Sequence, residues 1–431
     1  MKKVGIVSLG CSKNLVDSEN ILGLFDHNGY SVTPNPEEAD VIVVNTCGFI
    51  EPSKKESIEN ILEMLSYGKK VVVTGCLAER YLEELKKEIP EVDVYIPIRD
   101  YNRFNKCLSL IDKDLDTSLG VSDEYRIVST GHFSAYLKIG EGCDNRCAYC
   151  AIPLIRGGFV SRPFEAIIKE AKELASNGIK EIVVLQQDTT KYGVDIKDPN
   201  VNIVSLLKEL LKIKELDYIR LLYLYPDEIS DELIELIGKE KRLTPYFDIP
   251  IQHSESHILK DMYRRGDKEF LLNLFKKIRE KVPNAILRTT VMVGFPGEKE
   301  EDVDSLIEFM KEVKFDHLGG FTYSLEEGTP AYTYSNQVDE ETKEKRLSKV
   351  MKAQQKISYS LNKKHVGEVM EGLVIGKDKD YYLFRSYWNA PDDVDGKIFV
   401  TSSKELHSGD KMKVKITDAF VYDLMGEYVN E

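Results

Sequence analysis

Short apolar runs alternate with longer amphipathic stretches along the first 120 residues. The runs at residues 4–9, 40–46 and 70–75 are rich in valine and isoleucine, which is typical of parallel strands buried on both faces. Residues 12–29 and 51–68 carry apolar side chains at every third or fourth position, which predicts helices. The pattern therefore predicts an N-terminal open parallel α/β sheet domain.

A second series of strand and helix patterns begins near residue 133. It predicts strands at residues 135–142, 181–188, 218–226, 245–253, 286–298 and 317–324. Helical patterns separate these runs, for example at residues 163–178, 233–240 and 270–282. Six β/α units predict a TIM-like barrel, partial or complete, with its chemistry at the carboxyl ends of the strands.

A charged helical pattern over residues 340–364 leads into a small all-β tail. The tail predicts strands at residues 366–376, 381–386, 396–401, 411–420 and 426–429, with turns at 391–393 and 408–410. Five short strands predict a small β-barrel. We therefore expect three domains, at residues 1–125, 130–362 and 365–431.

Composition and charge fit a folded protein outside membranes. Of the 431 residues, 42% are hydrophobic and 31% charged, and no run approaches the length of a membrane span. The first residues predict a strand and not a signal peptide, so we expect a cytoplasmic protein. The net charge of −14 argues against a large nucleic-acid footprint and fits a basic protein partner, although it also simply favours solubility.

The seven cysteines are candidate metal ligands, because disulfides are rare in a reducing cytosol. Cys11, Cys47 and Cys76 each follow the carboxyl end of a predicted strand. Loops at these ends converge on one edge of a parallel sheet, so the three thiols can meet there. The alternative is that each is a small buried hydrophobic residue, which is how we interpret Cys107 at an apolar helical position.

Cys143, Cys147 and Cys150 form a C-x3-C-x2-C pattern after a predicted strand. Three thiolates this close can hold three corners of a 4Fe-4S cluster. A zinc site is less favoured, since structural zinc takes four ligands and the motif offers three. The spacing therefore indicates an iron–sulfur cluster with one iron open to another ligand.

This three-cysteine spacing resembles the signature of the radical S-adenosylmethionine superfamily. The resemblance implies that S-adenosylmethionine binds the open iron and yields a 5′-deoxyadenosyl radical. It places Ala148 and Tyr149 near the nucleoside. It also suggests polar contacts from strand ends, with the candidates Glu141, Gln186, Asp188, Arg288 and Glu298. No catalytic side chain is assigned beyond the clusters.

Together with the N-terminal cysteines and the small β tail, the whole chain resembles the methylthiotransferases of that superfamily. The resemblance implies a partial (β/α)6 barrel, a TRAM module as the tail, and a second 4Fe-4S cluster on Cys11, Cys47 and Cys76. S-adenosylmethionine then has two roles, as methyl donor and as radical source. The resemblance further implies an electron donor such as flavodoxin or ferredoxin and a sulfur source, and we expect a monomer.

The motifs resemble the branch of this family that modifies a ribosomal protein. These motifs are SLGCSKNLVDSE, NTCGFIEPSKKES, LQQDTTKYG and YSLEEGTPAY. The resemblance implies methylthiolation at the β-carbon of an aspartate of ribosomal protein S-twelve. The tail agrees, because residues 366–431 hold 8 basic and 13 acidic residues, a net charge of −5 that suits a basic protein better than RNA. Glu326 and Glu327 are expected to add acidity near the barrel mouth.

One segment departs from the family pattern. Phe159 and Val160 stand where a basic residue is common, which leaves Arg156 and Arg162 to contact a phosphate or carboxylate, or to form ordinary salt bridges. Two other functions stay open. One is methylthiolation of a transfer RNA adenosine by the same chemistry. The other is a non-enzymatic iron–sulfur or RNA-binding protein, which would not cleave S-adenosylmethionine.

Overall fold

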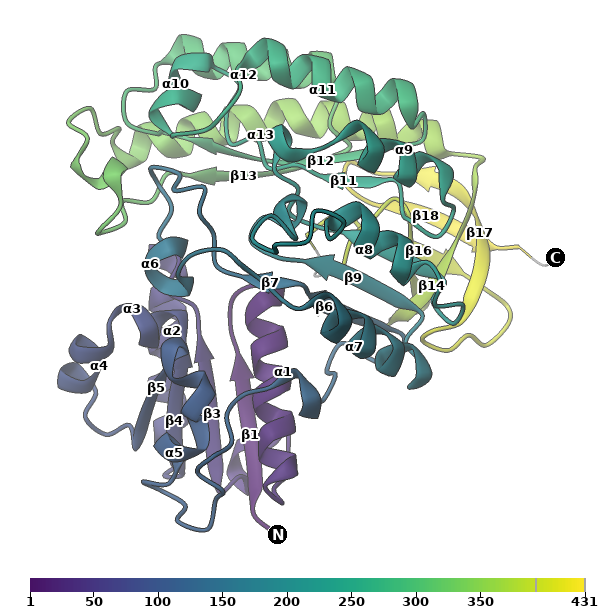
Figure 1. Cartoon of the computed structure of the whole chain (residues 1–431). Coiled ribbons are helices and arrows are strands. Elements are labelled where there is room, and N and C mark those ends of the chain that lie inside the picture. Colours follow the sequence, from purple (N-terminus) through teal and green to yellow (C-terminus); the bar gives the residue numbers. More distant parts are fainter. Residues whose placement is uncertain (392–393, 430–431) are drawn as a thin grey trace.

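The N-terminal part is a five-stranded parallel sheet. A computed structural model describes residues 1–391 and 394–429 (Figure 1). The strands lie in the order β2-β1-β3-β4-β5. Their bounds are β1 (Lys3–Ser8), β2 (Ser31–Val32), β3 (Val41–Thr46), β4 (Lys70–Gly75) and β5 (Val94–Pro97). The three predicted strands are present, and the sequence reading missed β2 and β5, which are short and lie at the two edges.

Helices cover both faces of this sheet. They are α1 (Ser12–His27), α2 (Glu51–Ser66), α3 (Cys76–Arg80), α4 (Leu82–Glu88) and α5 (Phe104–Leu108). Ile21 and Leu24 of α1 pack on one face, and Ile61 of α2 packs on the other. Cys107 lies partly buried at the edge of the first of these apolar clusters, as its apolar helical position predicted.

The central part is an open barrel of six parallel strands (Figure 1). The strands are β6 (Ser134–Lys138), β9 (Glu181–Leu185), β10 (Tyr218–Leu221), β11 (Tyr246–Asp248), β12 (Ile286–Val293) and β13 (His317–Thr322). They pair as β10-β9-β6 and β11-β12-β13, and a bridge between Ile219 and Leu243 joins the two sheets. Within the described residues no pairing closes β13 onto β6, so the barrel is partial.

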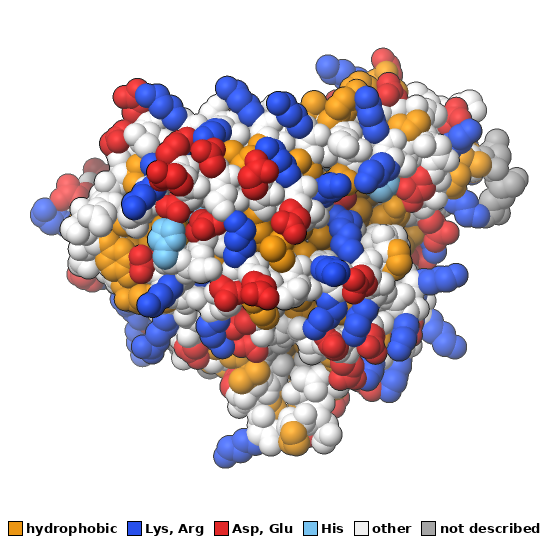
Figure 2. Space-filling model, turned by 90° about the horizontal axis from the view of Figure 1, so that it is seen from above, with side chains coloured by type: hydrophobic (Ala, Val, Ile, Leu, Met, Phe, Trp, Pro, Cys, Tyr) orange, Lys and Arg blue, Asp and Glu red, His pale blue; other side chains and the backbone are white. Residues whose placement is uncertain are grey.

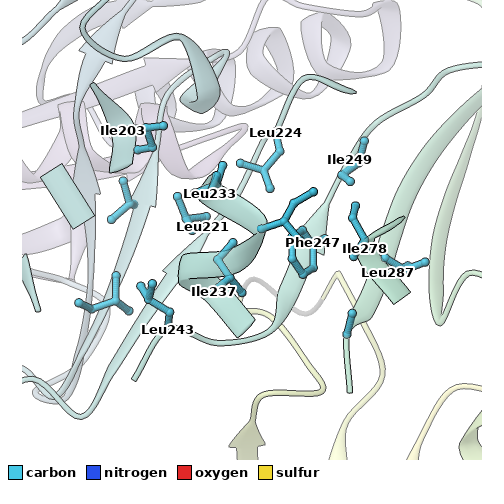
Figure 3. Close-up of a cluster of buried hydrophobic side chains, with 14 of the residues drawn as sticks. Ile203, Leu221, Leu224, Leu233, Ile237, Leu243, Phe247, Ile249, Ile278 and Leu287 are labelled. Carbon is cyan, nitrogen blue, oxygen red and sulfur yellow. The ribbon is translucent and has the colours of Figure 1, made fainter. Parts of the chain in front are cut away.

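Seven helices lie outside the barrel strands. They are α7 (Phe164–Ser176), α8 (Ile203–Leu210), α9 (Asp231–Lys239), α10 (Ser256–Asp261), α11 (Lys268–Lys281), α12 (Glu300–Val313) and α13 (Glu340–Asn362). Figure 3 shows the apolar layer between strands and helices, where Phe247 and Leu287 from strands meet Ile237 and Ile278 from helices. Alternate strand residues point into this layer, which fixes the register of each strand.

The C-terminal part is a closed five-stranded barrel, as predicted. Its strands are β14 (Val369–Asp378), β15 (Tyr381–Ser386), β16 (Ile398–Thr401), β17 (Lys411–Ala419) and β18 (Leu424–Tyr428). Of the turn expected at 391–393, residues 392 and 393 lie outside the described residues. Trp388 and Met370 of the small barrel share one apolar cluster with Tyr136, Val183 and Tyr246 of the central barrel. The two barrels are therefore packed against each other through a continuous core.

We propose domain bounds at residues 1–125, 130–362 and 365–431. Each boundary falls between the last strand of one sheet and the first strand of the next. In the described part of the chain, no helix combines the length and the apolar character needed to span a bilayer. Acidic and basic side chains are interspersed on the face seen in Figure 2.

Candidate active site

The three N-terminal cysteines lie at one edge of the first sheet. Cys47 and Cys76 directly follow β3 and β4, and Cys11 follows β1 after a short turn. Because these strands are neighbours and parallel, their carboxyl ends meet. Gly10 is required for this approach, since a Cβ there would lie 2.9 Å from Cys47 Cβ at a φ of +87°. Gly48 plays the same part, with the backbone beside Cys76 within 2.9 Å of its added Cβ.

Asn14, in the first turn of α1, ties these strand ends together. Its Nδ2 donates to the carbonyls of Leu9 (2.8 Å) and Thr46 (3.0 Å), and Cys76 Sγ lies 3.6 Å from its Oδ1. Burial raises the pKa of Cys76 to about 11, and burial raises the pKa of Cys47 as well. Such thiols become thiolates when a metal centre replaces their protons. The pocket therefore suits a soft metal centre and not a free reactive thiol.

The C-x3-C-x2-C loop lies between β7 (Gly140–Glu141) and α6 (Ile152–Arg156). Asn145 inside the loop donates through Nδ2 to Asp188 Oδ2 at 2.7 Å, and Lys191 donates to Asn145 Oδ1. These contacts tie the loop to the segment after β9. Burial raises the pKa of Cys143 and of Cys150, as it does for Cys47 and Cys76.

Two other segments clamp the end of the cysteine loop. The N–H of Ala148 donates to the carbonyl of Met262 at 2.9 Å, and the carbonyl of Ala148 accepts the N–H of Ala331 at 2.8 Å. Ala148 is fully buried in a small apolar cluster against which Tyr149 packs. Both residues thus form an apolar wall next to the cysteines, which is compatible with the predicted place beside a nucleoside.

Cys147 is the buried member of the motif and has polar neighbours. Its Sγ lies 3.5 Å from the Tyr225 hydroxyl and 4.0 Å from Arg264 Nη1. The Arg264 guanidinium stacks 4.0 Å from the centre of the Tyr225 ring. A cation and a hydroxyl therefore lie beside this sulfur.

Backbone strain is concentrated at the same edge of the barrel. Six described non-glycine residues have positive φ, and four of them flank this site: Arg146, Tyr223, Gln252 and Tyr263. Arg146 belongs to the cysteine loop, while Tyr223 and Gln252 follow β10 and β11. Left-handed conformations in such residues persist only where packing enforces them, and they cluster at functional sites.

Gln186 has the environment of a ligand contact. It follows β9 and is fully buried, yet neither its Nε2 nor its Oε1 has a hydrogen-bond partner in the chain. A Cβ at Gly140 would lie 2.5 Å from this amide, so glycine leaves room for it. A buried amide without partners costs about 1–3 kcal/mol, which a polar ligand would offset.

Three other candidates are engaged within the chain. Glu141 accepts from Gln187 (2.8 Å), and burial would raise its pKa, but neighbouring cations hold the pKa below its usual range. Asp188 holds Asn145 of the cysteine loop, as described above. Glu298 accepts the N–H of Gly294 with both oxygens and pairs with Arg346 at 2.9 Å. These carboxylates shape the loops at the site.

The prediction that Arg288 lies at a strand end is wrong. It is the third residue of the eight-residue strand β12. Its guanidinium pairs with Asp248 at 2.6 Å and with Asp395 of the C-terminal barrel at 3.5 Å. Arg288 thus holds the two barrels together. The sequence pattern did not reveal the position of Arg288 within the strand, because the polar residues that end the predicted strand lie well beyond Arg288.

The expectation for Glu326 also needs correction. Its side chain is 2% exposed and pairs with Arg80 (2.6 Å) and Lys54 (3.1 Å) of the N-terminal part. Its charge is therefore neutralised inside the chain, and only Glu327 stays exposed near the barrel mouth. Arg162 is likewise held by Asp123 and Glu170.

Three family models match consecutive parts of the chain. The model described as uncharacterized protein family UPF0004 matches residues 3–97, the radical SAM superfamily model matches residues 137–310, and the TRAM domain model matches residues 366–429. These ranges contain the first sheet, the end of β6 with the barrel strands β9 to β12, and the closed barrel.

Relatives match over the full length. A protein of Aquifex aeolicus named ribosomal protein uS12 methylthiotransferase RimO is 48% identical, covering 98% of this chain and 96% of its own. Proteins of the same name from Caldicellulosiruptor saccharolyticus and Clostridioides difficile are 46% and 47% identical, with complete coverage of both chains. The chain belongs to the RimO family.

Solved structures share the fold at low identity. The radical S-adenosylmethionine methyltransferase TsrM of Kitasatospora setae, solved with cobalamin and a [4Fe-4S] cluster, has a TM-score of 0.56 at 14% identity. It covers 95% of this chain and 84% of its own. The cobalamin-dependent radical enzyme OxsB has a TM-score of 0.53 at 11% identity, with 81% and 56% covered. These matches support the fold of this RimO family member.

Some residues of the site escaped sequence reasoning. Asn14, Asn145 and Arg264 contact or position the cysteines, but none was a candidate. Asn145 stands inside the cysteine motif, so its position was a usable signal. Asn14 lies three residues after Cys11, one helical turn on, which is a weaker signal. Arg264 comes from the segment after α10, and no local pattern pairs it with Cys147.

Proposed function

We propose that this RimO family chain adds a methylthio group to the β-carbon of an aspartate of ribosomal protein uS12. One observation carries the proposal: one set of three cysteines follows the strand ends of the N-terminal sheet, and the other follows β6 and β7 at the start of the barrel. Contacts of α1 with β6 and of α3 with α6 hold these two parts together. The full-length relatives named uS12 methylthiotransferases support the reaction and its substrate.

Cys143, Cys147 and Cys150 are the ligands we propose for the radical-forming 4Fe-4S cluster. When bound, that cluster and S-adenosylmethionine supply a 5′-deoxyadenosyl radical, which can remove hydrogen from an unactivated carbon. The chain fixes the loop through Asn145 and Asp188. The buried apolar wall around Ala148 excludes water, which protects a reactive species.

Cys11, Cys47 and Cys76 are the ligands we propose for an auxiliary 4Fe-4S cluster that supplies the sulfur. Three thiols on adjacent strand ends, two of them buried (Cys47 and Cys76) and one exposed (Cys11), are the donor set such a cluster takes. For S-adenosylmethionine we propose Gln186, with its unpartnered buried amide, as the polar contact. The Ala148 and Tyr149 wall would lie beside the nucleoside.

A basic protein substrate fits the charge of the chain. The net charge is −14 overall and −5 in residues 366–431, so long-range attraction favours a basic partner over RNA phosphates. Glu327, and not Glu326, is the exposed carboxylate at the barrel mouth. A cytoplasmic monomer served by an electron donor such as flavodoxin or ferredoxin, and by a separate sulfur source, completes the proposal.

Two cysteine variants test the division of labour. In anaerobically reconstituted protein with a chemical reductant and S-adenosylmethionine, Cys147→Ala should abolish 5′-deoxyadenosine. Cys47→Ala should retain that product and lose methylthiolation of uS12. Wild-type protein should hold about eight irons and each variant about four. Loss of 5′-deoxyadenosine in Cys47→Ala would show that the two cysteine sets do not act separately.

Mass spectrometry identifies the substrate. Cells without the gene should lack a methylthio group on uS12 and keep their transfer RNA modifications. If the group is missing from a transfer RNA adenosine instead, the protein substrate is wrong while the chemistry stands. If wild-type protein forms no 5′-deoxyadenosine at all, the radical reaction itself is wrong.

A further inference from the structure

Arg156 is a buried arginine in contact with an N-terminal cysteine. It is the last residue of α6, six positions after Cys150, and its side chain is 2% exposed. Its Nη2 donates to Cys76 Sγ at 3.5 Å and to Asn14 Oδ1. The segment that carries the radical-site cysteines therefore reaches across to a ligand of the other cysteine set.

The rest of the guanidinium is fixed by carboxylates. Arg156 Nη1 donates to Asp17 Oδ2 at 2.6 Å and to Glu141 Oε2 at 3.1 Å. Lys138 pairs with the same two carboxylates. Two buried cations thus balance two carboxylates, buried Asp17 and partly exposed Glu141, before Cys76 is counted. A thiolate at Cys76 adds a further negative charge. Among the described residues, the cation that donates a hydrogen bond to this sulfur is Arg156, through Nη2.

Packing keeps this arginine in place. Ala151 and Ile155 of the α6 region form an apolar cluster with Cys76 itself. The planar fork reaches α1, α3 and β7 at once, through Asn14, Cys76 and Glu141. A lysine at this position would keep the charge but has a single nitrogen, so it cannot make all four contacts.

We propose that Arg156 is a positioning residue for the auxiliary cluster, one that donates a charge-assisted N–H···S hydrogen bond to the Cys76 ligand and raises the reduction potential of that cluster. The inference rests on the proposed ligand set Cys11, Cys47 and Cys76. Hydrogen bonds and positive charge at a ligand sulfur favour the reduced, more negative state of a cluster. Because Arg156 belongs to the radical-site segment, it also couples the placement of the two sites.

The test isolates the auxiliary cluster. In a Cys143→Ala, Cys147→Ala, Cys150→Ala background, the reconstituted full chain should bind about four irons. A potentiometric titration followed by EPR then measures the auxiliary cluster alone. Arg156→Gln should lower its midpoint potential by about 59 mV or more, which is a tenfold change in the ratio of reduced to oxidised cluster. The midpoint potential of Arg156→Lys should lie between those of the parent and Arg156→Gln.

Arg162→Gln is the matched control. Arg162 lies on the same segment and is also largely buried, but it pairs with Asp123 and Glu170 and contacts neither cysteine set. Its variant should leave the potential unchanged. Equal potentials in Arg156→Gln and the parent, at equal iron content, would overturn the proposal.

A second measurement leaves Arg156 intact, so it does not depend on folding of a variant. Protein labelled with ¹⁵N-arginine should show a ¹⁵N hyperfine coupling to the reduced auxiliary cluster in pulsed EPR. Absence of that coupling would refute the N–H···S contact. If the parent background binds no iron, the auxiliary cluster itself is wrong, which is a failure of the proposed function and is distinct from a failure at Arg156.

Discussion

At the residue scale, the cysteines depend on neighbours that hold their loops. Asp188 is fully buried and accepts from Asn145 within the cysteine loop, and from Thr190 at 2.5 Å. Gln186, two residues earlier, instead leaves its amide unpaired. The carboxyl end of β9 therefore supplies both a carboxylate that supports the cysteine loop (Asp188) and an amide without a partner in the chain (Gln186).

Asp188→Asn should lower the formation of 5′-deoxyadenosine by about 10- to 100-fold, since the loss of a carboxylate that orients a ligand loop has effects of this size. The iron of the auxiliary set should stay bound. Rates measured by chromatography of the nucleoside check this. Asp195→Asn is the control, because Asp195 accepts from the N–H of Ser161 and does not touch the cysteine loop. Equal losses in both variants would contradict the role of Asp188.

Gln186→Leu tests the proposed contact with S-adenosylmethionine. Leucine removes the unpaired amide atoms at similar volume, so the folded protein should keep or gain stability. Binding of S-adenosylmethionine should weaken by about 1 kcal/mol or more, as one hydrogen bond is lost. Calorimetric binding to reconstituted protein gives the affinity. An unchanged affinity would remove Gln186 from the site.

At the scale of elements, buried ion pairs join the N-terminal sheet to the barrel. Glu326 follows β13 and holds Lys54 of α2 and Arg80 of α3. Asp17 of a different helix, α1, pairs with Lys138 of β6. Two separate contacts of this kind resist rotation of one part against the other, which keeps the two cysteine sets in a fixed relation.

Glu326→Gln should therefore separate the two half-reactions. Removing one partner of a buried ion pair costs about 3–5 kcal/mol, because Arg80 loses the carboxylate it pairs with, while Lys54 keeps Glu51. We expect 5′-deoxyadenosine formation to persist while methylthiolation of uS12 falls. Hydrogen exchange in α2 and α3 should rise in parallel.

Glu327→Gln is the neighbouring control, since Glu327 is exposed and its side chain takes part in no ion pair among the described contacts. Glu327→Gln should leave hydrogen exchange in α2 and α3 unchanged. If Glu326→Gln loses both products equally, the bridge supports folding in general and not the relation of the two sites.

At the scale of the whole molecule, the small β-barrel is a fixed part of the central barrel. Glu181, at the start of β9, pairs with Arg385 of β15 at 2.7 Å and with Arg220 of β10 at 3.2 Å. Burial alone would raise the pKa of Glu181, but the two arginines hold the pKa below its usual value. A TRAM barrel that is packed this way is an integral structural element and not a freely moving module.

Glu181→Gln should lower the free energy of unfolding by about 3–5 kcal/mol at neutral pH. A carboxyl with a lowered folded-state pKa stabilises the fold above its unfolded pKa, and this stabilisation is lost as pH falls through the folded-state value. The difference between wild type and variant should thus be full above about pH 4.5 and should shrink below it.

Urea unfolding as a function of pH measures this difference. Glu371→Gln is the control at the same interface, because Glu371 is 49% exposed where it pairs with Lys411. Its loss should cost about 0–1 kcal/mol. A pH-independent difference for Glu181→Gln would show that the side chain acts through packing and not through its charge.

The sequence alone determined most of the long elements and the six candidate cluster ligands, but it missed the short edge strands β2 and β5. The elements follow from hydrophobic periods of two and 3.6 residues, and the ligands follow from cysteines after three predicted strands or in one short motif. Both are local features that can be recognised without knowledge of the fold. The sequence did not determine strand length, as the misplacement of Arg288 shows, because a run of apolar and polar residues does not mark where strand pairing ends.

Only the tertiary structure decided which charges meet. Arg156 lies 80 residues from Cys76, and Arg80 lies 246 residues from Glu326. In the sequence, Arg156, Arg80 and Glu326 each look like a solvated surface charge. They become buried only when two domains pack together. The cost of burying a charge makes such partners specific, yet that cost depends on docking and leaves no trace in the local sequence.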